Sequence, residues 1–374
     1  MKRAILKPRE ERRIQRGHLW VYRNELETIP PLEDGDVADV YTHDGKFLAR
    51  CFYQAEGGIA FRVLDYAQVD IDATFLAGRI SRARGLRETL FPGSSVYRWT
   101  HGESDGLPGL VVDRYASVVH VHTSCAFYAR HADVLVDAFM SGGDVTGVSL
   151  QFSGRREPRG TMPRQLRCDF GGIEVEIDLE KSQKTGLFLD QRLNRQWLRE
   201  LAPNKRVLDC HAYVGAWSIE AAKAGAAQVT AVDSSAPAIE RARHNAELNG
   251  VLERCSFETK DVSAKLQEDA LYDIVILDPP ALAKTRASAE KALGLYQSLN
   301  RDAMKRITPG GYLITSSCSH FVDREAFMEM LKRASRAAHR PLTLLALAGA
   351  SPDHPVSLAM PETEYLKCAI ARVD

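Results

Sequence analysis

One acidic residue follows directly after an apolar run and is held by two prolines. The run 272–277 predicts a buried strand, and Asp278, Pro279 and Pro280 come next. The prolines fix the backbone and remove two amide donors, which leaves carbonyl oxygens beside the carboxylate. At the carboxyl end of a strand, such a corner can hold a planar amine or the edge of a base. The alternative is an ordinary turn that ends the strand.

A cysteine occupies the corresponding place after the next predicted strand. The run 312–315 leads through Ser316 and Ser317 into Cys318, so Cys318 should lie beside Asp278 in one crevice. A thiol whose pKa is lowered locally can act as a nucleophile. Most cysteines are instead small core residues. We give that interpretation to the other six cysteines, at positions 51, 125, 168, 210, 255 and 368.

The cysteine pattern also bears on metals and on location. No C-x-x-C pair and no metal-ligand spacing occurs, so no metal site is predicted. An odd, scattered set of seven cysteines indicates reduced thiols and a cytoplasmic protein. Residues 1–8 lack the apolar core of a signal peptide, and no apolar run reaches membrane-spanning length. We therefore expect a soluble protein without a membrane partner.

The stretch 205–233 predicts the βαβ unit that positions this crevice. A strand ends at Asp209, a turn containing Gly215 follows, and a helix leads to a second strand that ends at Asp233. A carboxylate at that tip can accept hydrogen bonds from two ribose hydroxyls. The turn has one glycine where a dinucleotide site has three, which disfavours a NAD-dependent oxidoreductase. The alternative for Asp233 is that it only caps the next helix.

Length and pattern predict three domains, because 374 residues can build two or three separate cores. Residues 1–71 contain short apolar runs between Asp-Gly and Gly-Gly turns, typical of antiparallel hairpins. Residues 72–184 predict a central α+β domain with helices over 75–90 and 128–140. We expect the arginines of the first helix to face away from its apolar side, and residues 158–164 to form an exposed basic loop.

Residues 185–374 alternate apolar strands with helical patterns, which predicts an α/β fold with a doubly wound sheet. The expected helices cover residues 190–201, 237–248 and 290–306, and Pro309-Gly310-Gly311 predicts a turn before the strand 312–315. Residues 342–348 and 365–373 predict a pair of strands at the edge of the sheet.

Charge is balanced over the chain and uneven along it. Lys plus Arg and Asp plus Glu number 49 each, so no global field attracts nucleic acid. Basic clusters at residues 2–23, 79–87 and 155–167 are compatible with local phosphate contacts, the alternative being solvated basic faces. Trp20 and Tyr22 lie beside the first cluster. We expect at least one of them to be a core residue of the N-terminal module.

Several stretches that match in order along the chain resemble one family. They are KTGLFLDQRLNR, VLDCHAYVGAWS, VILDPPALAK, GGYLITSSCSH and the tail DHPV…PETEYLK, with SDGLPGLVVDRY in the central segment. Together they are similar to the bacterial large-subunit ribosomal RNA 5-methylcytosine methyltransferases, which depend on S-adenosyl-L-methionine. The resemblance implies a Rossmann-like class I methyltransferase domain at 185–374 and an RNA-binding PUA-like barrel at 1–71. It also implies ribosomal RNA as the partner. The sequence leaves the oligomeric state open, with a homodimer as one alternative.

The resemblance further implies a role for individual residues. The cofactor-binding residues would be Phe188, Gln191, Asp209, Tyr213, Gly215, Asp233, Asp261 and Asp278. Asp233 would hold the ribose, and Asp261 would lie near the adenine. Asp278 would also face the target cytosine, with Cys318 as the nucleophile. His211, and Ala216 where glycine is more usual, depart from the family pattern, and no second cysteine follows Pro280.

Two other functions remain open from the sequence. Methylation at an exocyclic amine would use Asp278 without a cysteine nucleophile. A non-catalytic RNA-binding protein would bind RNA without transferring a methyl group, and would leave Asp278 and Cys318 without a role.

Overall fold

The computed structural model describes residues 1–178, 187–283 and 285–374, which form two compact units. Unit 1 contains Met1–Leu166, Asp178 and Pro352–Thr363. Unit 2 contains Arg167–Ile177, the described residues 187–351 and Glu364–Asp374. The chain therefore returns to unit 1 near its end before it completes unit 2.

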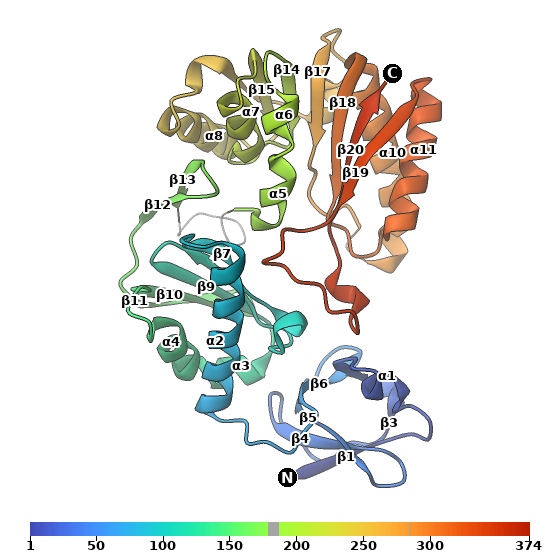
Figure 1. The fold of residues 1–374 in the computed structure, drawn as a ribbon. Coiled ribbons are helices and arrows are strands. Elements are labelled where there is room, and N and C mark those ends of the chain that lie inside the picture. Colours follow the sequence, from blue (N-terminus) through green and yellow to red (C-terminus); the bar gives the residue numbers. More distant parts are fainter. Residues whose placement is uncertain (179–186, 284) are drawn as a thin grey trace. The chain divides into compact units, whose positions relative to one another are not determined.

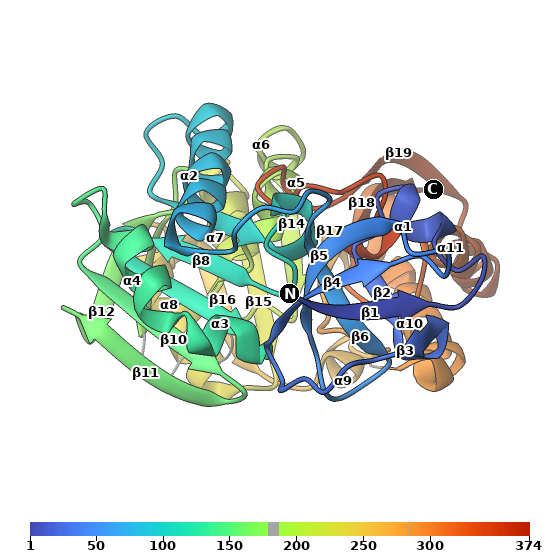
Figure 2. The same ribbon diagram turned by 90° about the horizontal axis from the view of Figure 1, so that it is seen from below.

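Unit 1 begins with a six-stranded sheet in the order β2-β6-β5-β4-β1-β3 (Figure 2). Its elements are β1 (Lys2–Leu6), α1 (Arg12–Gln15), β2 (Trp20–Tyr22), β3 (Leu26–Thr28), β4 (Val37–Tyr41), β5 (Phe47–Tyr53) and β6 (Ile59–Asp65). Most neighbouring strands are antiparallel, as predicted, whereas β1 and β4 run parallel. In β2 only Val21 is buried, and the expectation that Trp20 or Tyr22 belongs to the core is wrong. Successive residues of a strand face opposite sides, so burial of Val21 turns both aromatic rings to the other face.

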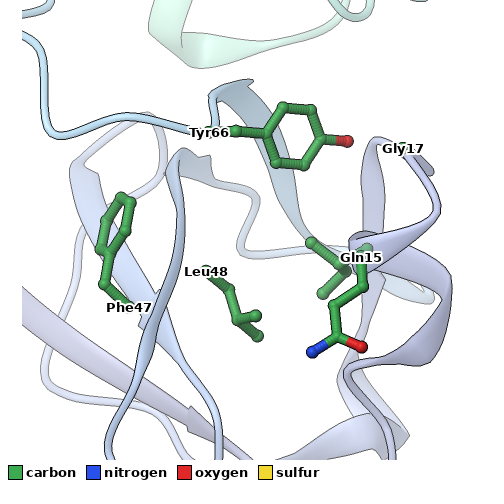
Figure 3. Close-up of a pocket in the computed structure, with 6 residues that line it drawn as sticks. Gln15, Gly17, Phe47, Leu48 and Tyr66 are labelled. Atoms are coloured by element: carbon green, nitrogen blue, oxygen red, sulfur yellow. The ribbon is translucent and has the colours of Figure 1, made fainter.

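A pocket of about 350 Å³ lies in this module (Figure 3). Its lining residues are Ile14, Gln15, Gly17, Phe47, Leu48 and Tyr66. None of them belongs to the residues that the sequence singles out for chemistry.

The second sheet of unit 1 has the order β11-β10-β9-β8-β7. Its elements are α2 (Ala73–Leu90), β7 (Val96–His101), β8 (Val111–Tyr115), β9 (Val118–Thr123), α3 (Ala126–Arg130), α4 (Ala132–Met140), β10 (Gly147–Phe152) and β11 (Arg155–Gly160). Residues 155–160, including part of the predicted basic loop, are thus an edge strand paired with β10. The helix predicted over 128–140 is divided near His131, whose Nδ1 lies 2.7 Å from the Phe127 carbonyl oxygen. Such a hydrogen bond between a side chain and a backbone carbonyl competes with the backbone hydrogen bond that would continue the helix.

One arginine of α2 does not face solvent as predicted. Arg87 is fully buried, and its guanidinium donates to both carboxylate oxygens of Asp105 at 2.5 and 2.8 Å. It also donates to the Asp353 carbonyl oxygen at 2.7 Å. A buried guanidinium is stable when a carboxylate and carbonyl groups satisfy it in this way. The apolar spacing of the helix could not reveal that partner, since it comes from another segment.

Unit 2 is built on a seven-stranded sheet in the order β16-β15-β14-β17-β18-β20-β19 (Figure 1). The strands are β14 (Arg206–Cys210), β15 (Gln228–Asp233), β16 (Cys255–Thr259), β17 (Tyr272–Leu277), β18 (Ile307–Ser317), β19 (Leu342–Ala348) and β20 (Lys367–Val373). The first five are parallel to one another, and β20 is antiparallel to both β18 and β19. The hairpin β12 (Gln165–Asp169) and β13 (Glu174–Asp178) precedes this sheet.

The helices of unit 2 lie on both sides of its sheet. They are α5 (Arg192–Arg195), α6 (Leu198–Leu201), α7 (Ala216–Lys223), α8 (Ala236–Leu248), α9 (Val262–Lys265), α10 (Ala289–Lys305) and α11 (Arg324–Ala338). One core joins buried residues of α9, α10 and α11 to β14, β17 and β18, while α6, α7 and α8 pack next to one another. The α/β doubly wound prediction for this part of the chain is confirmed. No helix among the described residues is long and apolar enough to cross a membrane.

Two local predictions in unit 2 are wrong. The helix expected over 190–201 is a short 3-10 turn followed by α5 and α6. Here the Asn194 amide donates to Gln191 Oε1 and to the Gly349 carbonyl oxygen, which ties the segment to its surroundings. The turn expected at 309–311 lies inside β18, where the register against β17 shifts. A bulge accommodates the glycines there without ending the strand.

Candidate active site

The carboxyl ends of β14, β15, β17 and β18 meet at one edge of the sheet of unit 2, because these strands are parallel. Asp278 and Cys318 follow β17 and β18. The Cys318 Sγ lies 4.0 Å from the carbonyl oxygen of Pro279. The structure thus brings the two predicted reactive stretches together. Open parallel sheets bind their ligands at this edge.

The Asp278 carboxylate is held by two donors from other segments. Gln191 Nε2 donates to Oδ1 at 2.9 Å, and Trp217 Nε1 donates to Oδ2 at 3.0 Å. Burial raises the pKa of Asp278 to about 6, although the Trp217 and Gln191 hydrogen bonds favour the charged form. A carboxyl group with this pKa can donate a proton near neutral pH.

Gln191 also connects this corner to β18. Its amide donates to the Ser316 hydroxyl at 3.0 Å, and its oxygen accepts from Asn194. Gln191 is almost fully buried. Its side chain therefore contacts Asp278 inside the protein and does not face solvent. Sequence reasoning found Gln191 but missed Trp217 and Ser316. A tryptophan at the start of α7, directly after the turn that follows β14, was the sequence signal that could have identified Trp217 as a site residue.

The turn between β14 and α7 contains three residues with left-handed backbones. The φ angles of His211, Tyr213 and Gly215 are +63°, +51° and +83°. Side-chain-bearing residues rarely adopt this region, and clusters of them mark ligand sites. His211 and Tyr213 therefore replace the glycines that the turn lacks. At Gly215 a Cβ atom would lie 3.0 Å from the Ala242 Cβ atom of α8, so the close approach of that helix requires glycine.

Asp233 at the end of β15 has both carboxylate oxygens on backbone amides. Oδ2 accepts from Tyr213 at 3.0 Å, and Oδ1 accepts from Ser235 at 2.9 Å. The cap of α8 is the Ser235 side chain, which accepts from Ala238. The alternative role of Asp233 as the helix cap is therefore wrong. Each of its oxygens retains acceptor capacity for a further donor.

The remaining cofactor-binding candidates lie around the same turn. The rings of Phe188 and Tyr213 meet edge to face with centroids 5.4 Å apart, and Phe188 is 44% exposed. Asp261 follows β16 and accepts from the Ala264 amide at 3.2 Å as the cap of α9. The preceding residue, Lys260, donates its amide to the Asp233 carbonyl oxygen at 3.0 Å, which places Asp261 beside β15.

Asp209 is the one candidate that is fully buried. It lies within β14, and its Oδ2 accepts from the Ser218 hydroxyl at 2.6 Å. Its Oδ1 is buried without a hydrogen-bond partner in the described part of the chain. Burial raises the pKa of Asp209 to about 7. A buried acceptor without a donor is costly unless a ligand satisfies it.

The turn that carries Cys318 is fixed from two sides. The Ser319 hydroxyl accepts from the Ala283 amide at 3.1 Å and lies 3.1 Å from the hydroxyl of Tyr296 on α10. On the other side Lys367 Nζ donates to the Ser319 carbonyl oxygen at 2.8 Å. Among the described residues, no cluster of His, Cys, Asp and Glu could hold a metal ion.

Comparison with known proteins identifies the family. The chain is 34% identical to ribosomal RNA large subunit methyltransferase I of Shewanella denitrificans, over 99% of both chains. It is 35% identical to the protein of the same name from Shewanella amazonensis, again over 99% of both. The chain belongs to the ribosomal RNA large subunit methyltransferase I family. This agrees with the match of residues 167–347 to the S-adenosylmethionine-dependent methyltransferases and of residues 4–66 to the PUA-like domains.

Solved structures with the same fold match this chain over its whole length. A candidate SAM-dependent methyltransferase from Streptococcus mutans has a TM-score of 0.87 at 21% identity, with both chains fully covered. A candidate methyltransferase complexed with SAH has a TM-score of 0.89 at 22% identity, also with full coverage. The fold prediction of a Rossmann-like methyltransferase with an N-terminal PUA-like domain is confirmed, as is S-adenosyl-L-methionine as the cofactor.

Proposed function

We propose that this family member forms 5-methylcytosine in large-subunit ribosomal RNA through a covalent adduct at Cys318. The observation that carries this proposal is the thiol of Cys318 beside the backbone of Pro279, directly after Asp278. A methyltransferase that acts on an exocyclic amine needs the carboxylate and proline corner alone. A cysteine at the adjacent strand end is needed when the acceptor is a ring carbon.

The cofactor would lie along the ends of β14, β15 and β16. Asp233 would accept hydrogen bonds from the ribose hydroxyls, and Asp261 would lie near the adenine. The unpartnered Oδ1 of Asp209 fits a donor such as the ammonium of the methionine part. Phe188, together with Tyr213 and Gly215 of the turn, would contact the same ligand. When bound, S-adenosyl-L-methionine supplies a methyl group on a positively charged sulfur.

The protein must make C5 of cytosine reactive, since this carbon is a weak nucleophile. The Cys318 thiolate forms a bond to C6, and the electrons of the C5–C6 double bond shift into the ring. Proton donation from Asp278 to N3 stabilises the resulting enamine, whose C5 then accepts the methyl group with release of S-adenosyl-L-homocysteine. N3 returns its proton to Asp278. Loss of the C5 proton to a base re-forms the double bond and breaks the C6–sulfur bond. The thiolate is regenerated.

The environment of Asp278 suits this proton transfer. Its carboxyl group, with a pKa of about 6, is protonated in about half of the molecules at pH 6 and in about a tenth of them at pH 7. Gln191 and Trp217 fix its orientation, which keeps the carboxyl group aimed in one direction. The target base must leave its stack to reach this corner, as in other enzymes that modify bases.

RNA would also contact the rest of the chain. We propose that residues 1–71 and 72–184 are two RNA-contacting domains, with 185–374 as the methyltransferase domain. Electrostatic contacts of their basic clusters with phosphates would supply affinity and position. We further propose that the protein acts in the cytoplasm, where ribosomal RNA is available. A homodimer stays a prediction.

Methylation of purified large-subunit ribosomal RNA by the full chain tests this function. Nucleoside analysis by mass spectrometry after incubation with labelled S-adenosyl-L-methionine should show label in 5-methylcytidine. Cys318→Ala should abolish the label, while Cys255→Ala, a change of the other partly exposed cysteine, should retain it. Label on an exocyclic amine would support the rival reaction instead. Binding of RNA without any transfer would contradict an enzymatic role.

A further inference from the structure

Lys367, the first residue of β20, has an unusual environment for a lysine. Its side chain is only 3% exposed. The ammonium donates to the carbonyl oxygens of Ser319 and Tyr365, both at 2.8 Å. No carboxylate lies within ion-pair distance of it in the part of the chain that the structure describes. Burying an ammonium without an anion is costly, so such a group usually serves a nearby negative charge.

The position of Lys367 in the sheet shows which negative charge that could be. In the antiparallel pair of β18 and β20, Lys367 lies opposite Ser317. Its Nζ reaches the carbonyl oxygen of Ser319. The ammonium therefore binds the same three-residue turn that presents Cys318, between the two serines.

We propose that Lys367 is a positioning residue that holds the Cys318 thiol as a thiolate by supplying the positive charge beside it. The proposal rests on Cys318 being the nucleophile, as argued under the proposed function. The thiol proton leaves to solvent before RNA binds, and Lys367 keeps its own proton throughout. When sulfur bonds to C6, the negative charge moves into the ring and is neutralised by the proton from Asp278. Release of the product restores the thiolate beside the ammonium.

The electrostatics of Lys367 support this pairing. Burial lowers the pKa of Lys367 to about 8, and the charge of Cys318 is the largest of the effects that raise it again. Asp323 and Glu364 contribute less. A cation that is favoured by the thiolate must favour the thiolate in return, since their interaction is mutual. Cations next to cysteines are a known cause of low thiol pKa values.

Other titratable groups also border this turn, and a test must separate them from Lys367. They are Asp278 after β17, Tyr296 on α10, His320 after Cys318, Asp323 before α11, and Glu364. Three of these groups are carboxylates, and a nearby carboxylate would raise the thiol pKa instead of lowering it. Lys367 differs from His320 in being buried rather than exposed at the surface.

The first test measures the pKa of Cys318 directly, without RNA or cofactor. Alkylation of the full-length protein by iodoacetamide is followed as a function of pH, and the Cys318 and Cys255 peptides are quantified by mass spectrometry. In Lys367→Met we expect the Cys318 pKa to rise by about one unit or more. Alkylation of Cys318 near pH 7 should then be about tenfold slower, and Lys367→Arg should largely restore the rate. An unchanged Cys318 pKa in a folded Lys367→Met protein would overturn the proposal.

Cys255 is the internal control, because it is the other partly exposed cysteine and burial raises its pKa to about 11. Its alkylation should be slow and equal in all variants. A parallel change at Cys255 would show that Lys367→Met loosens the whole unit, which would contradict a specific effect on Cys318.

A second measurement avoids changing Lys367 in the protein that is titrated. The ammonium is titrated by NMR in protein with ¹³C-labelled lysine, and its signal is identified by its absence from Lys367→Arg. The pKa of Lys367 should fall by about one unit in Cys318→Ser, since an anion that favours the ammonium has been removed. An equal pKa in both proteins would refute the pairing. A positive result here without RNA methylation would reject the proposed function and leave the pairing intact.

Discussion

The two sides of the sheet edge in unit 2 are held together in different ways. At the ends of β14 and β15, side chains bind mostly to the backbone: Asp233 accepts from two amides, and the Asn245 amide donates to the Val214 carbonyl oxygen at 3.1 Å. At the ends of β17 and β18, side chains from distant segments hold the reactive residues, as Gln191 and Trp217 hold Asp278.

The difference indicates that the two sides have different functions. A backbone-anchored turn keeps its shape when single side chains change, which suits the binding of a cofactor. A network of side chains fixes individual reactive atoms and fails when one member is lost. Substitutions on the first side should therefore alter cofactor affinity, and substitutions on the second side should alter the rate of methyl transfer.

The largest effect is expected at the second side, from Cys318→Ala. Methyl transfer should fall by about a thousandfold or more, because the covalent step is lost. Calorimetry should give the same Kd for S-adenosyl-L-methionine in both proteins, since the thiol is not needed to bind the cofactor. Weaker cofactor binding together with slow transfer would remove the distinction between the two sides.

Asp278→Asn should lower kcat by about a hundredfold, the usual size of a lost proton transfer. The pH profile adds a specific sign. Because the pKa of Asp278 is raised to about 6, the acid form is depleted as the pH rises above 6. The kcat of the wild-type protein should therefore fall as the pH rises above 6, and this fall should be absent from the variant. Asp269→Asn, a change of a fully exposed aspartate, should leave the profile as it is.

Asp209→Asn tests the buried carboxylate on the first side through stability. The folded-state pKa of about 7 lies above the unfolded value near 3.8, so the folded protein binds this proton more tightly. The stabilising contribution is present below pH 4 and is lost as the pH rises to 7. The loss amounts to roughly 2–4 kcal/mol for about three pKa units. Urea unfolding between pH 5 and 8 should show a smaller decline in the variant, and an identical decline would contradict the assignment.

Asp233→Asn should give the smallest effect of the series. Losing the charge weakens hydrogen bonds to the ribose hydroxyls, and we expect the Kd for S-adenosyl-L-methionine to rise about tenfold. At saturating cofactor, kcat should stay within about twofold of the wild-type value. A strong loss of kcat at saturation would place Asp233 with the reactive side.

The sequence predicted the parts of the site that follow from local pattern. Strands that end in Asp233, Asp278 and Cys318 had to meet at one edge once the sheet was parallel. Contacts between distant segments could not be predicted in this way. Trp217 and Lys367 reach the site through the turn of α7 and the register of β20, neither of which is visible in spacing alone.

Errors in the sequence analysis have the same origin. The spacing in α2 placed its arginines toward solvent, whereas Asp105 draws Arg87 into the core. The turn after β14 has one glycine where a dinucleotide site has three, yet His211 and Tyr213 adopt the left-handed conformation themselves. Tertiary hydrogen bonds and strain at a ligand site override local preference.

The central claim, a covalent bond between Cys318 and the target base, can be tested by trapping. Large-subunit ribosomal RNA that contains 5-fluorocytosine has no C5 proton to lose, so the adduct cannot resolve after methyl transfer. We predict a stable protein–RNA complex that requires S-adenosyl-L-methionine, with mass spectrometry locating the methylated base on Cys318. Absence of a complex with RNA that is methylated in its natural form, or a complex that persists in Cys318→Ala, would contradict the account.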